Sequence, residues 1–372
     1  MKLGELAYEV RDFREPSEVA GLPYVGLEHI GKGTLSLVGI GATDEVTSTK
    51  KAFRAGDVLF GSLRPYFRKV VMPRFDGVCS TDITVLRPRA AADASFAFYA
   101  MASPDFIALA TRSSNGTGMP RAKWQVVSHL PIAPFTPKAR QRIGRVLAAY
   151  DDLIENNGKR IAILEELVRT LYRQWFVELR FPGAEPWRAC LLADHIDEVR
   201  DAVDPKDLPS ETPYFGLEHL PRRATTLQTW GTAGEVTSTK LRVSPGDILF
   251  GKIRPYFHKV GVSPVRAVCS ADAVVIRPKR DALRAAVLGC VSSDGFVARA
   301  SVSSRGAKMP RASWELLRRE PLPLPPERWL ARYDELAGSA VQLASVLGLE
   351  NRALAATRDL LLPRLLGGRW ES

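Results

Sequence analysis

Two short segments place a carboxylate beside an imidazole, a pairing that can perform acid–base chemistry. Glu28 precedes His29, and Glu218 precedes His219, each pair within the sequence Gly-Leu-Glu-His. General acid–base catalysis and metal binding both use these side chains. We expect each pair to lie on a strand, however, where adjacent residues face opposite sides of the sheet. The two side chains could not readily share one substrate atom there, so the sequence favours a structural role over an enzyme acting at these residues.

Two longer segments bring guanidinium, aromatic and ammonium groups together. Arg-Pro-Tyr-Phe-Arg-Lys occupies residues 64–69, and Arg-Pro-Tyr-Phe-His-Lys occupies residues 254–259. Such mixtures suit the neutralisation of phosphates combined with stacking or apolar packing against sugars. The alternative is a solvated basic turn whose tyrosine and phenylalanine are anchored in the core. We favour proximity to DNA.

Two further kinds of segment could face a nucleic acid. Thr-Ser-Thr-Lys, at residues 47–50 and 237–240, offers hydroxyls and an ammonium group that can bind phosphate oxygens or base edges, or hydroxyls that merely cap a turn. Loops rich in glycine or serine, at residues 112–118 and 303–308, lead into Met-Pro-Arg and could face DNA or be mobile surface loops. The residues that we predict to bind DNA are Lys50, Lys51, Arg64, Tyr66, Arg68, Lys69, Arg112, Arg121, Lys123, Lys240, Lys252, Arg254, Tyr256, His258, Lys259, Arg305, Lys308 and Arg311.

Motifs for other chemistry are absent. The sequence contains no phosphate-binding G-x-x-x-x-G-K-[ST], no G-x-S-x-G elbow, no H-E-x-x-H, no dinucleotide fingerprint and no (N/D)PP(Y/F) segment of an adenine methyltransferase. Its cysteines are widely spread without a C-x-x-C pair, and its five histidines are not clustered. We therefore expect no metal site, and reduced, buried thiols. The cysteines are Cys79, Cys190, Cys269 and Cys290.

The composition is that of a globular protein with an excess of positive charge. The chain's 372 residues carry 52 Lys and Arg against 41 Asp and Glu, a net charge of +11. This length predicts about two or three domains, and the charge suggests a polyanionic partner. The sequence has no uninterrupted apolar stretch of about 18 residues and no apolar region near its N-terminus. We therefore expect no membrane span, no secretory signal and a cytoplasmic location.

The segments recur because the chain contains a tandem duplication of a whole domain. Tyr24 begins Tyr-Val-Gly-Leu-Glu-His-Ile and Tyr214 begins Tyr-Phe-Gly-Leu-Glu-His-Leu, an offset of 190 residues. At the same offset GDVLFGSLRPYFRKV matches GDILFGKIRPYFHKV, VCSTD matches VCSAD, and MPRAKW matches MPRASW. One register over such a length excludes a short solenoid repeat. Within each copy, short apolar segments bounded by glycine predict strands, and residues 94–103 and 281–293 predict helices.

A long helical pattern follows each copy. Apolar residues spaced seven apart after Pro137 lie along one helix face, as in a coiled-coil seam, with Asn157 as a polar position in that seam. We expect this helix to end near Phe181 and a less regular one to run from Trp329 to Leu366. Packing of each helix within its own domain is the alternative, but their placement favours an antiparallel pair. The helix residues that we predict to form this spacer and to meet partners are Ile154, Ile161, Leu164, Val168, Leu171, Trp175, Leu336, Leu343, Leu347, Leu354 and Leu361.

In their order and repetition these motifs resemble those of one known family, the specificity (S) subunits of type I restriction–modification enzymes. The resemblance covers nearly the whole chain. It rests on two domains that alternate with two helical segments, on GDVLFGSLRPYF and GDILFGKIRPYF followed by CSTD and CSAD, on LYRQWFV at 171–177 and on TRDLLLPRLLGG at 357–368. One departure is that the P-P-L-x-E-Q segment of many members is replaced here by APFTPKARQ and PLPPERW.

The resemblance implies an α+β fold with pseudo-two-fold symmetry. Two similar mixed α/β target-recognition domains would be separated by two long antiparallel helices that form a coiled-coil spacer. The parts that we expect are target-recognition domain 1 at residues 1–136, a central helical spacer at 137–183, target-recognition domain 2 at 184–326 and a C-terminal helical spacer at 327–372. The helices would set the distance between two DNA half-sites and dock partner subunits.

The resemblance also implies a subunit without catalysis of its own. It would bind a bipartite sequence in double-stranded DNA, one domain to each half-site, and dock two methyltransferase (M) subunits. S-adenosylmethionine would bind to the M subunits, and ATP and Mg²⁺ would serve restriction/translocase (R) subunits; this chain shows no site for these ligands. The rival interpretation is a stand-alone sequence-specific DNA-binding or scaffold protein without methyltransferase partners.

Because the two copies are so alike, we expect two similar half-sites and a nearly palindromic target. Any asymmetry would come from residues that differ between the copies and from the loops 112–118 and 303–308. The differing pairs are Ser62/Lys252, Arg68/His258 and Lys123/Ser313.

Overall fold

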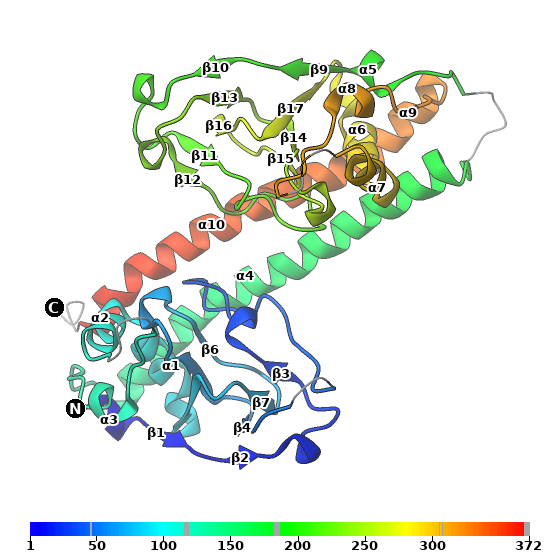
Figure 1. The fold of residues 1–372 in the computed structure, drawn as a ribbon. Helices are drawn as coiled ribbons and strands as arrows, with labels where there is room; N and C mark the ends of the chain where they lie inside the picture. The colour runs from blue at the N-terminus through cyan, green and yellow to red at the C-terminus, as the bar shows by residue number, and fades with distance from the viewer. Residues whose placement is uncertain (45–46, 115–118, 182–186, 305, 307, 368–372) are drawn as a thin grey trace. The chain divides into compact units, whose positions relative to one another are not determined.

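The computed structural model describes residues 1–44, 47–114, 119–181, 187–304, 306 and 308–367 (Figure 1). The chain divides into two compact units. Unit 1 comprises Met1–Leu153 with Leu354–Ser372, and unit 2 comprises Ile154–Ala353. Each unit thus contains one copy of the repeat and one end of each long helix, and the predicted four-part division stays a prediction.

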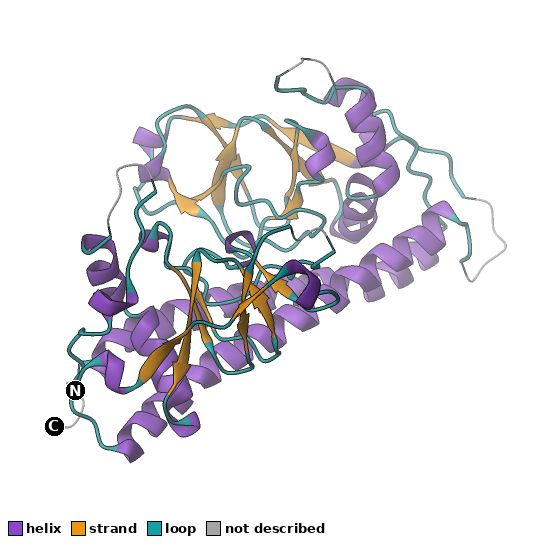
Figure 2. Ribbon diagram, turned by 60° about the horizontal axis from the view of Figure 1, so that its bottom comes forward, coloured by secondary structure: helices purple, strands orange, loops and turns teal. Residues whose placement is uncertain are grey.

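Unit 1 contains two four-stranded sheets and three short helices, which Figure 2 shows in orange and purple. One sheet has the order β1-β8-β5-β6 with antiparallel neighbours, and the other has the order β2-β4-β7-β3, in which β3 and β7 are parallel. The elements are β1 (Ala7–Val10), β2 (Phe13–Arg14), β3 (Tyr24–Val25), β4 (Lys50–Phe53), β5 (Val58–Gly61), β6 (Val70–Val71), β7 (Gly77–Cys79), β8 (Ile83–Pro88), α1 (Ala94–Ala102), α2 (Pro104–Arg112) and α3 (Trp124–Val127).

Unit 2 repeats this arrangement. Its sheets have the orders β15-β14-β17-β9 and β10-β13-β16-β11-β12, so that only β12 is added. The register is also repeated, since Leu59 lies opposite Val85 and Leu249 lies opposite Val275. The elements are β9 (Ile196–Val199), β10 (Ala202–Val203), β11 (Pro213–Phe215), β12 (Gly231–Thr232), β13 (Lys240–Val243), β14 (Ile248–Gly251), β15 (Val260–Val262), β16 (Ala267–Ser270), β17 (Ala273–Pro278), α5 (Leu192–His195), α6 (Arg284–Val291), α7 (Asp294–Val302) and α8 (Trp314–Leu317).

A glycine–aspartate turn leads into the central strand β5. Gly56 has a φ of +86°, a conformation that residues with a side chain rarely adopt. The buried carboxylate of Asp57 accepts a hydrogen bond from the backbone N–H of Arg54 at 2.8 Å and a two-pronged ion pair from Arg87 at 2.7 Å. The turn before β14 repeats these contacts, with Asp247 and Arg277 at 2.7 Å. A buried charge is thereby paired in both copies, which is the condition under which it is tolerated.

The predicted strands and helices within each copy are largely present. All four residues of β5 and of β14 are buried, as their continuous apolar runs require, and α1 fills the predicted helix at 94–103. Residues 281–293 begin with a 3₁₀ turn before α6. The segment from Tyr24 was expected to be one strand; only β3 is, because the chain turns at Gly26 into the 3₁₀ helix η3 (Leu27–His29).

The cysteines lie mostly in the core. Cys79, Cys269 and Cys290 are buried, Cys190 is half-buried, and all four are free. Burial raises the pKa of the Cys79 thiol to about 12.

No single helix of the described residues is long and apolar enough to cross a membrane. Residues 281–291 and α7 meet that test of length and composition only as a bent pair.

The long helical segments begin and end close to the expected residues. Helix α4 (Pro137–Tyr172) continues into a π-helical turn, η6 (Arg173–Val177). The second segment consists of α9 (Glu327–Tyr333), a π-helical turn η11 (Asp334–Gly338) and α10 (Ser339–Leu366), which contains Pro363. The last part of the first prediction, residues 182–183, lies outside the described residues.

Contacts within unit 2 show that the two helical segments are antiparallel. The Asn351 side chain donates a hydrogen bond to the carbonyl of Ile154 at 3.2 Å. Ile161 packs in one cluster with Ala344 and Leu347. The rings of Trp175 and Tyr333 lie 5.5 Å apart. Residues further along the first helical segment therefore contact residues that come earlier in the second, as in an antiparallel pair. The predicted α+β fold with two long antiparallel helices is confirmed.

The buried face of the first helical segment follows the expected seven-residue spacing. Ile161, Val168 and Trp175 are buried, Asn157 is 3% exposed within the same face, and Leu164 and Leu171 pack at its edge. The seam residue Ile154 is half-buried.

The second helical segment departs from that spacing at its start. Leu336 and Leu343 are 38% and 41% exposed, whereas Ala337, Ala340, Val341 and Ala344 are buried. The π-helical turn η11 explains the difference, because its wider turn shifts the face that follows by about one residue. Further along α10, Leu347 is buried, and Leu354 and Leu361 are half-buried.

One aromatic position of the core is supplied differently in the two units. Tyr99, on α1, is 1% exposed in unit 1. The matching residue of unit 2 is Gly289, and a Cβ atom placed there would lie 2.4 Å from the ring of Tyr172, which belongs to α4. The ring therefore comes from the globular copy in unit 1 and from the helix in unit 2.

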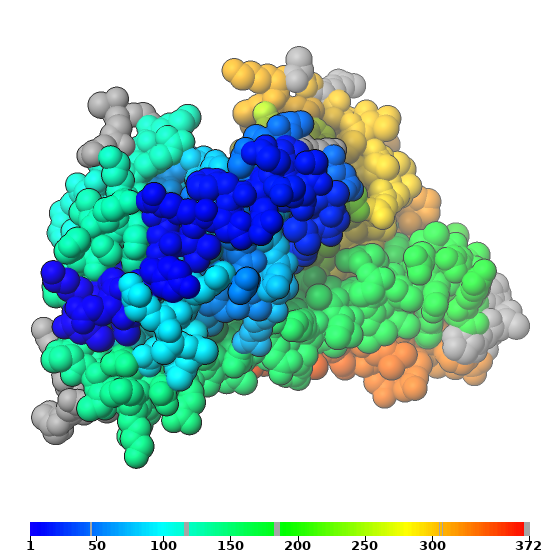
Figure 3. Space-filling model, turned by 90° about the horizontal axis from the view of Figure 1, so that it is seen from below, coloured from blue at the N-terminus to red at the C-terminus, as the bar shows by residue number. Residues whose placement is uncertain are grey.

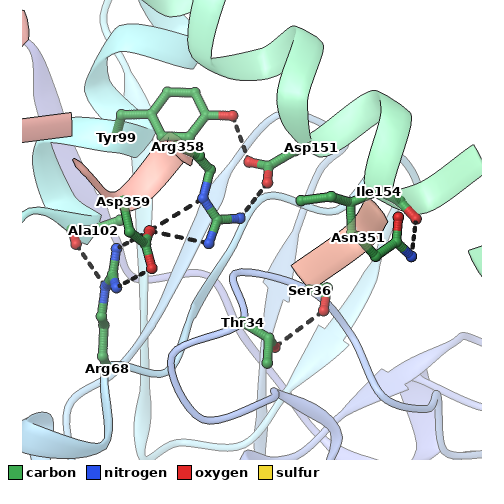
Figure 4. Close-up of polar contacts among 10 residues, drawn as sticks. All are labelled: Thr34, Ser36, Arg68, Tyr99, Ala102, Asp151, Ile154, Asn351, Arg358 and Asp359. Carbon is green, nitrogen blue, oxygen red and sulfur yellow. Dashed lines mark hydrogen bonds and ion pairs between the residues drawn. The ribbon is translucent and has the colours of Figure 1, made fainter. Parts of the chain in front are cut away.

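A cluster of charges around the buried Arg358 joins the globular copy of unit 1 to both helices (Figure 4). Arg358, on α10, is 1% exposed and forms ion pairs with Asp151 of α4 and, at 3.1 Å, with Asp359. Tyr99 donates a hydrogen bond to Asp151 at 2.5 Å. Arg68 donates to Asp359 at 3.2 and 3.3 Å and to the carbonyl of Ala102 at 2.9 Å. Burial raises the pKa of Asp151, a cost that the Arg358 guanidinium opposes.

In unit 2 the carboxylate of Glu165 makes a corresponding join. Glu165, on α4, accepts hydrogen bonds from the backbone N–H groups of Thr225 and Thr226 at 2.8 and 2.7 Å. The same oxygen accepts from the Thr226 hydroxyl at 2.7 Å and the Thr225 hydroxyl at 3.3 Å. Hydrogen bonds to an ionised acceptor are the stronger kind, so this contact fixes the loop against the helix.

Replacing Arg358 with alanine should destabilise unit 1. The substitution removes a buried guanidinium and leaves the half-buried carboxylate of Asp151 without its cation, and we expect a loss of about 3 kcal/mol in the free energy of unfolding. Urea-induced unfolding followed by circular dichroism measures this. The exposed Arg364 on the same helix gives the matched control, Arg364→Ala, for which about 0.5 kcal/mol or less is expected. Equal losses in the two variants would contradict the role assigned to the cluster.

Candidate nucleic-acid interface

Each Arg-Pro-Tyr-Phe segment forms a tight turn held in an uncommon conformation. The 3₁₀ helices η4 (Pro65–Phe67) and η9 (Pro255–Phe257) are flanked by residues with positive φ. The angles are 52° and 48° at Arg64 and Arg68, and 49° and 52° at Arg254 and His258. Non-glycine residues rarely adopt such angles, and they persist where surrounding structure imposes them, often at functional sites.

The surrounding structure is the Met-Pro-Arg loop, which pairs with this turn through its backbone. The N–H of Arg64 donates to the carbonyl of Pro120 at 2.8 Å, and the N–H of Ala122 donates to the carbonyl of Ser62 at 3.0 Å. In the second copy Arg254 pairs with Pro310 at 2.8 Å, and Ala312 with Lys252 at 3.0 Å. Two segments that are more than fifty residues apart in sequence are thus one surface in each copy.

A carboxylate from the Cys-Ser-x-Asp segment completes this surface. Arg121 donates to one oxygen of Asp82 at 3.0 and 2.8 Å, and Arg311 donates to one oxygen of Asp272 at 3.1 Å. We call this surface the tip of each copy. Its members are Arg64, Tyr66, Asp82, Met119 and Arg121 in unit 1, and Arg254, Tyr256, Asp272, Met309 and Arg311 in unit 2.

The tip exposes large apolar side chains beside its cations. Tyr66 and Tyr256 are 51% and 54% exposed, and Met119 and Met309 are 60% and 52% exposed. The neighbouring Phe67 is held by the fold instead. Its ring centre lies 4.7 Å from that of Tyr66, and the Lys32 ammonium lies over the Phe67 ring, 4.4 Å from the ring centre. Exposed aromatic groups beside guanidinium groups are suited to contact a polyanion with apolar surface between its charges.

Several predicted DNA-binding cations have partners inside the fold instead. Lys50 and Lys240 are buried, and their ammonium groups donate to the carbonyl and hydroxyl of the serine two residues before. Lys51 is 8% exposed and donates to the carbonyls of Thr81 and Ile83. These ammonium groups are bound within the fold, and in each Thr-Ser-Thr-Lys segment the serine hydroxyl accepts from the lysine of its own segment.

The residues after each Arg-Pro-Tyr-Phe turn are likewise engaged. Arg68 binds Asp359, as described above. His258, which takes its place, is 7% exposed; its Nε2 lies 2.7 Å from the carbonyl of Ser292, and burial lowers its pKa. Lys69 and Lys259 donate to the carbonyls of Leu27 and Leu217, and burial lowers the pKa of both.

The remaining predicted residues that the structure describes are exposed or half-buried. Arg112, at the end of α2, and Lys123, before α3, are exposed, as is Lys308. The Arg254 guanidinium donates to the carbonyl of Lys308 at 3.3 Å. Lys252 is half-buried at the base of the second tip. Arg305 lies outside the described residues.

Sequence reasoning missed the two aspartates of the tips. Asp82 and Asp272 are acceptors in a surface otherwise chosen for its cations, and their side chains are 31% and 38% exposed. A signal was present, because VCSTD and VCSAD recur at the same offset as the basic segments. The pairing with Arg121 and Arg311 depends on the fold and has no local sequence signature.

The Glu-His pairs have a structural role, although not for the expected reason. His29 lies in η3 rather than on a strand, and its Nδ1 accepts a hydrogen bond from the N–H of Gly26 at 2.9 Å. His219 does the same for Gly216. Glu28 is 65% exposed, in an N-terminal segment that lies at the surface of unit 1, dark blue in Figure 3. Among the described residues no group of three or more His, Cys, Asp and Glu side chains is placed to hold a metal ion.

Comparison with known proteins finds specificity subunits of type I restriction enzymes. No protein-family model matches the chain. The EcoDI specificity subunit of Escherichia coli is 27% identical over 195 residues, the HindI subunit of Haemophilus influenzae 28% over 136, and the MjaIX subunit of Methanocaldococcus jannaschii 35% over 65. These matches cover 51%, 35% and 18% of this chain, but only 43%, 29% and 15% of those relatives.

Solved structures extend the likeness to nearly the whole chain. The S subunit of a type I restriction–modification system from M. genitalium matches 98% of this chain and 95% of its own, with a TM-score of 0.58 and 14% identity, which shows a common fold. The HsdS subunit from Thermoanaerobacter tengcongensis covers 99% of this chain and 96% of its own, with 20% identity and a TM-score of 0.37. The resemblance expected from the duplicated motifs is confirmed: the chain is similar to the specificity subunits of type I restriction–modification enzymes.

Proposed function

We propose that the chain is the non-catalytic DNA sequence-recognition subunit of a type I restriction–modification complex. Each copy would read one half of a bipartite target in double-stranded DNA. The observation that carries this proposal is the tip, which the fold builds twice from the same three segments in a chain whose relatives are specificity subunits. The net charge of +11 suits a polyanionic ligand.

The chemistry of the tip supports this proposal. Arginine binds phosphates or guanine edges through its planar fork, and an aspartate can accept from the amine of cytosine. The exposed Tyr66 and Tyr256 add apolar contact area at little entropic cost. Phosphate contacts would supply affinity and salt dependence, and a few side chains would supply sequence preference.

The long helices would act as the spacer and as the dock for methyltransferase subunits. Their outer faces carry exposed apolar side chains that the fold does not cover. On α4, Val146 and Leu153 of unit 1 are 42% and 47% exposed, and Ile163 and Leu167 of unit 2 are 69% and 43% exposed. S-adenosylmethionine would then belong to the methyltransferase subunits, and ATP and Mg²⁺ to the restriction subunits that join through them.

The full chain, incubated with randomised duplexes, should enrich a sequence of two separated parts. Tyr66→Ala or Tyr256→Ala should weaken binding to that duplex about tenfold, because an exposed aromatic anchor is removed. Neither variant should change the melting temperature appreciably. Tyr8, 38% exposed on β1 away from the tip, gives the control Tyr8→Ala. Enrichment of no sequence would refute the proposed function, and an equal loss with Tyr8→Ala would remove the tip from it.

Salt dependence should show whether Arg64 and Arg254 meet phosphates. We expect Arg64→Ala and Arg254→Ala each to weaken binding to all duplexes and to lower the slope of log K against log salt by about one. Titrations at several salt concentrations, followed by fluorescence anisotropy, measure the slope. Arg142→Ala, at an exposed arginine of α4, is the control that should leave it unchanged. A slope equal to that of the wild type would place both guanidinium groups away from phosphate.

Docking of a methyltransferase subunit should depend on the outer face of α4. Ile163→Ser with Leu167→Ser removes exposed apolar area without touching the buried seam, so the melting temperature should hold while co-purification of a co-expressed methyltransferase subunit falls. The neighbouring exposed Ala162 supplies the control Ala162→Ser. Undiminished co-purification would move the dock elsewhere, and no co-purification of the wild-type chain would favour a stand-alone DNA-binding protein.

A further inference from the structure

The two tips differ at one position in their backbone framework, and this difference bears on the proposed function. Serine occupies position 62 in the first copy, and lysine occupies the matching position 252 in the second. Both residues follow the central strand, and both join the Cys-Ser-x-Asp turn to the Met-Pro-Arg loop. The N–H groups of Ser62 and Lys252 donate to the carbonyls of Asp82 and Asp272 at 3.0 and 2.9 Å. The side chain at this position therefore starts inside the tip.

In the first copy, the hydroxyl and the ammonium group at this place are used by the fold. The Ser62 hydroxyl donates to the carbonyl of Asp82 at 2.7 Å. An ammonium group is also present, but it comes from Lys51 on β4 and donates to the carbonyls of Thr81 and Ile83 at 3.0 and 2.9 Å. Lys51 is 8% exposed, so it is bound into the turn rather than offered to a ligand.

In the second copy, a lysine is found at a different position of the repeat. Leu241 stands where the first copy has Lys51, and Lys252 stands where it has Ser62. Lys252 is half-buried, and within the described part of the chain its ammonium group has no hydrogen bond or ion pair. A cation of this kind, on a rigid strand end and without an internal partner, is available to a ligand.

The neighbouring carboxylate is also only partly used. Arg311 binds one oxygen of Asp272, and the other oxygen accepts nothing from the described residues. Two residues whose backbones are hydrogen-bonded thus carry a donor and an acceptor that the described part of the fold leaves unused. In the first copy, Arg121 likewise binds one oxygen of Asp82, and the position that matches Lys252 carries the Ser62 hydroxyl in place of an ammonium group.

A donor beside an acceptor matches the edge of a G·C base pair in the major groove. Guanine presents the O6 and N7 acceptors there, which lysine can bind, and cytosine presents the N4 donor, which aspartate can bind. A phosphate fits less well, because its charge would lie near the Asp272 carboxylate and be repelled. The base edge is therefore the ligand that this pair of side chains suits.

We propose that Lys252 and Asp272 read a G·C base pair in the half-site of the second copy, whereas Asp82 in the first copy accepts from a base amine without a partnering lysine. Lys252 is then a specificity-determining residue, and the two half-sites differ at the base pair that this position reads. This inference rests on the proposed DNA recognition and deepens it.

The test converts the second tip into the arrangement of the first. The double variant Leu241→Lys with Lys252→Ser moves the lysine back to β13, to the position from which Lys51 binds the turn in the first copy. Because Leu241 packs against the core of unit 2, the melting temperature of the variant is measured alongside binding. The full-length wild type and variant are each incubated with randomised duplexes, and the enriched sequences are determined. We expect the variant to lose its preference for G·C at one position of one half-site, and to bind the wild-type sequence about ten- to a hundredfold more weakly.

The controls separate the possible outcomes. Lys240→Met removes a buried ammonium from β13, the strand that also carries Leu241, and should leave the preferred bases unchanged. If the double variant weakens binding equally for all sequences and lowers the salt slope by about one, Lys252 meets phosphate and the inference is overturned. The same holds if both proteins enrich identical sequences. If the wild type itself enriches no sequence, it is the proposed function that fails.

Discussion

Carboxylates on the two long helices hold the globular copies in place, and the rest of the structure depends on them. Asp359 binds Arg68 in unit 1, and Glu165 gathers four donors from Thr225 and Thr226 in unit 2. Ionised acceptors of this kind fix geometry as well as contributing energy. Each long helix therefore carries a carboxylate that binds one copy of the repeat.

The two carboxylates occupy related positions in their helices. Glu165 follows the buried Asn157 by eight residues, and Asp359 follows the buried Asn351 by the same number. A buried asparagine in a helical seam fixes the register of the pair. An anchor at a constant distance from it keeps each globular copy in a defined register along the helix that carries it.

Much of this fold follows from features that can be read in the sequence. The duplication, the buried central strands, the helix at 94–102 and the antiparallel helical pair all rest on periodicity or on repetition. The exposure of Leu336 and Leu343 could not be read in this way, because the π-helical turn at Asp334–Gly338 has no spacing signature of its own. The turn at Gly26, which ends β3, also could not be predicted from the spacing of apolar residues.

The candidate site was predictable in its segments and less so in its individual residues. The Arg-Pro-Tyr-Phe and Met-Pro-Arg segments do meet in each copy. A lysine in a polar turn looks the same in sequence whether its ammonium group faces solvent or, as with Lys50, Lys51 and Lys240, a backbone carbonyl. Arg68 is a similar case, since its partner Asp359 lies almost three hundred residues away.

The exchange of an aromatic ring between Tyr99 and Tyr172 limits how such a protein can be rearranged. A first copy transplanted to the second place would bring the Tyr99 phenol into space already taken by the Tyr172 ring, and the reverse transplant would leave a hole beside Gly289. Exchange of one globular copy for the other is therefore constrained at this position of the core. A hybrid that packs well must take each globular copy together with its matching stretch of helix, so the structural unit extends beyond the boundary that the repeat alone would suggest.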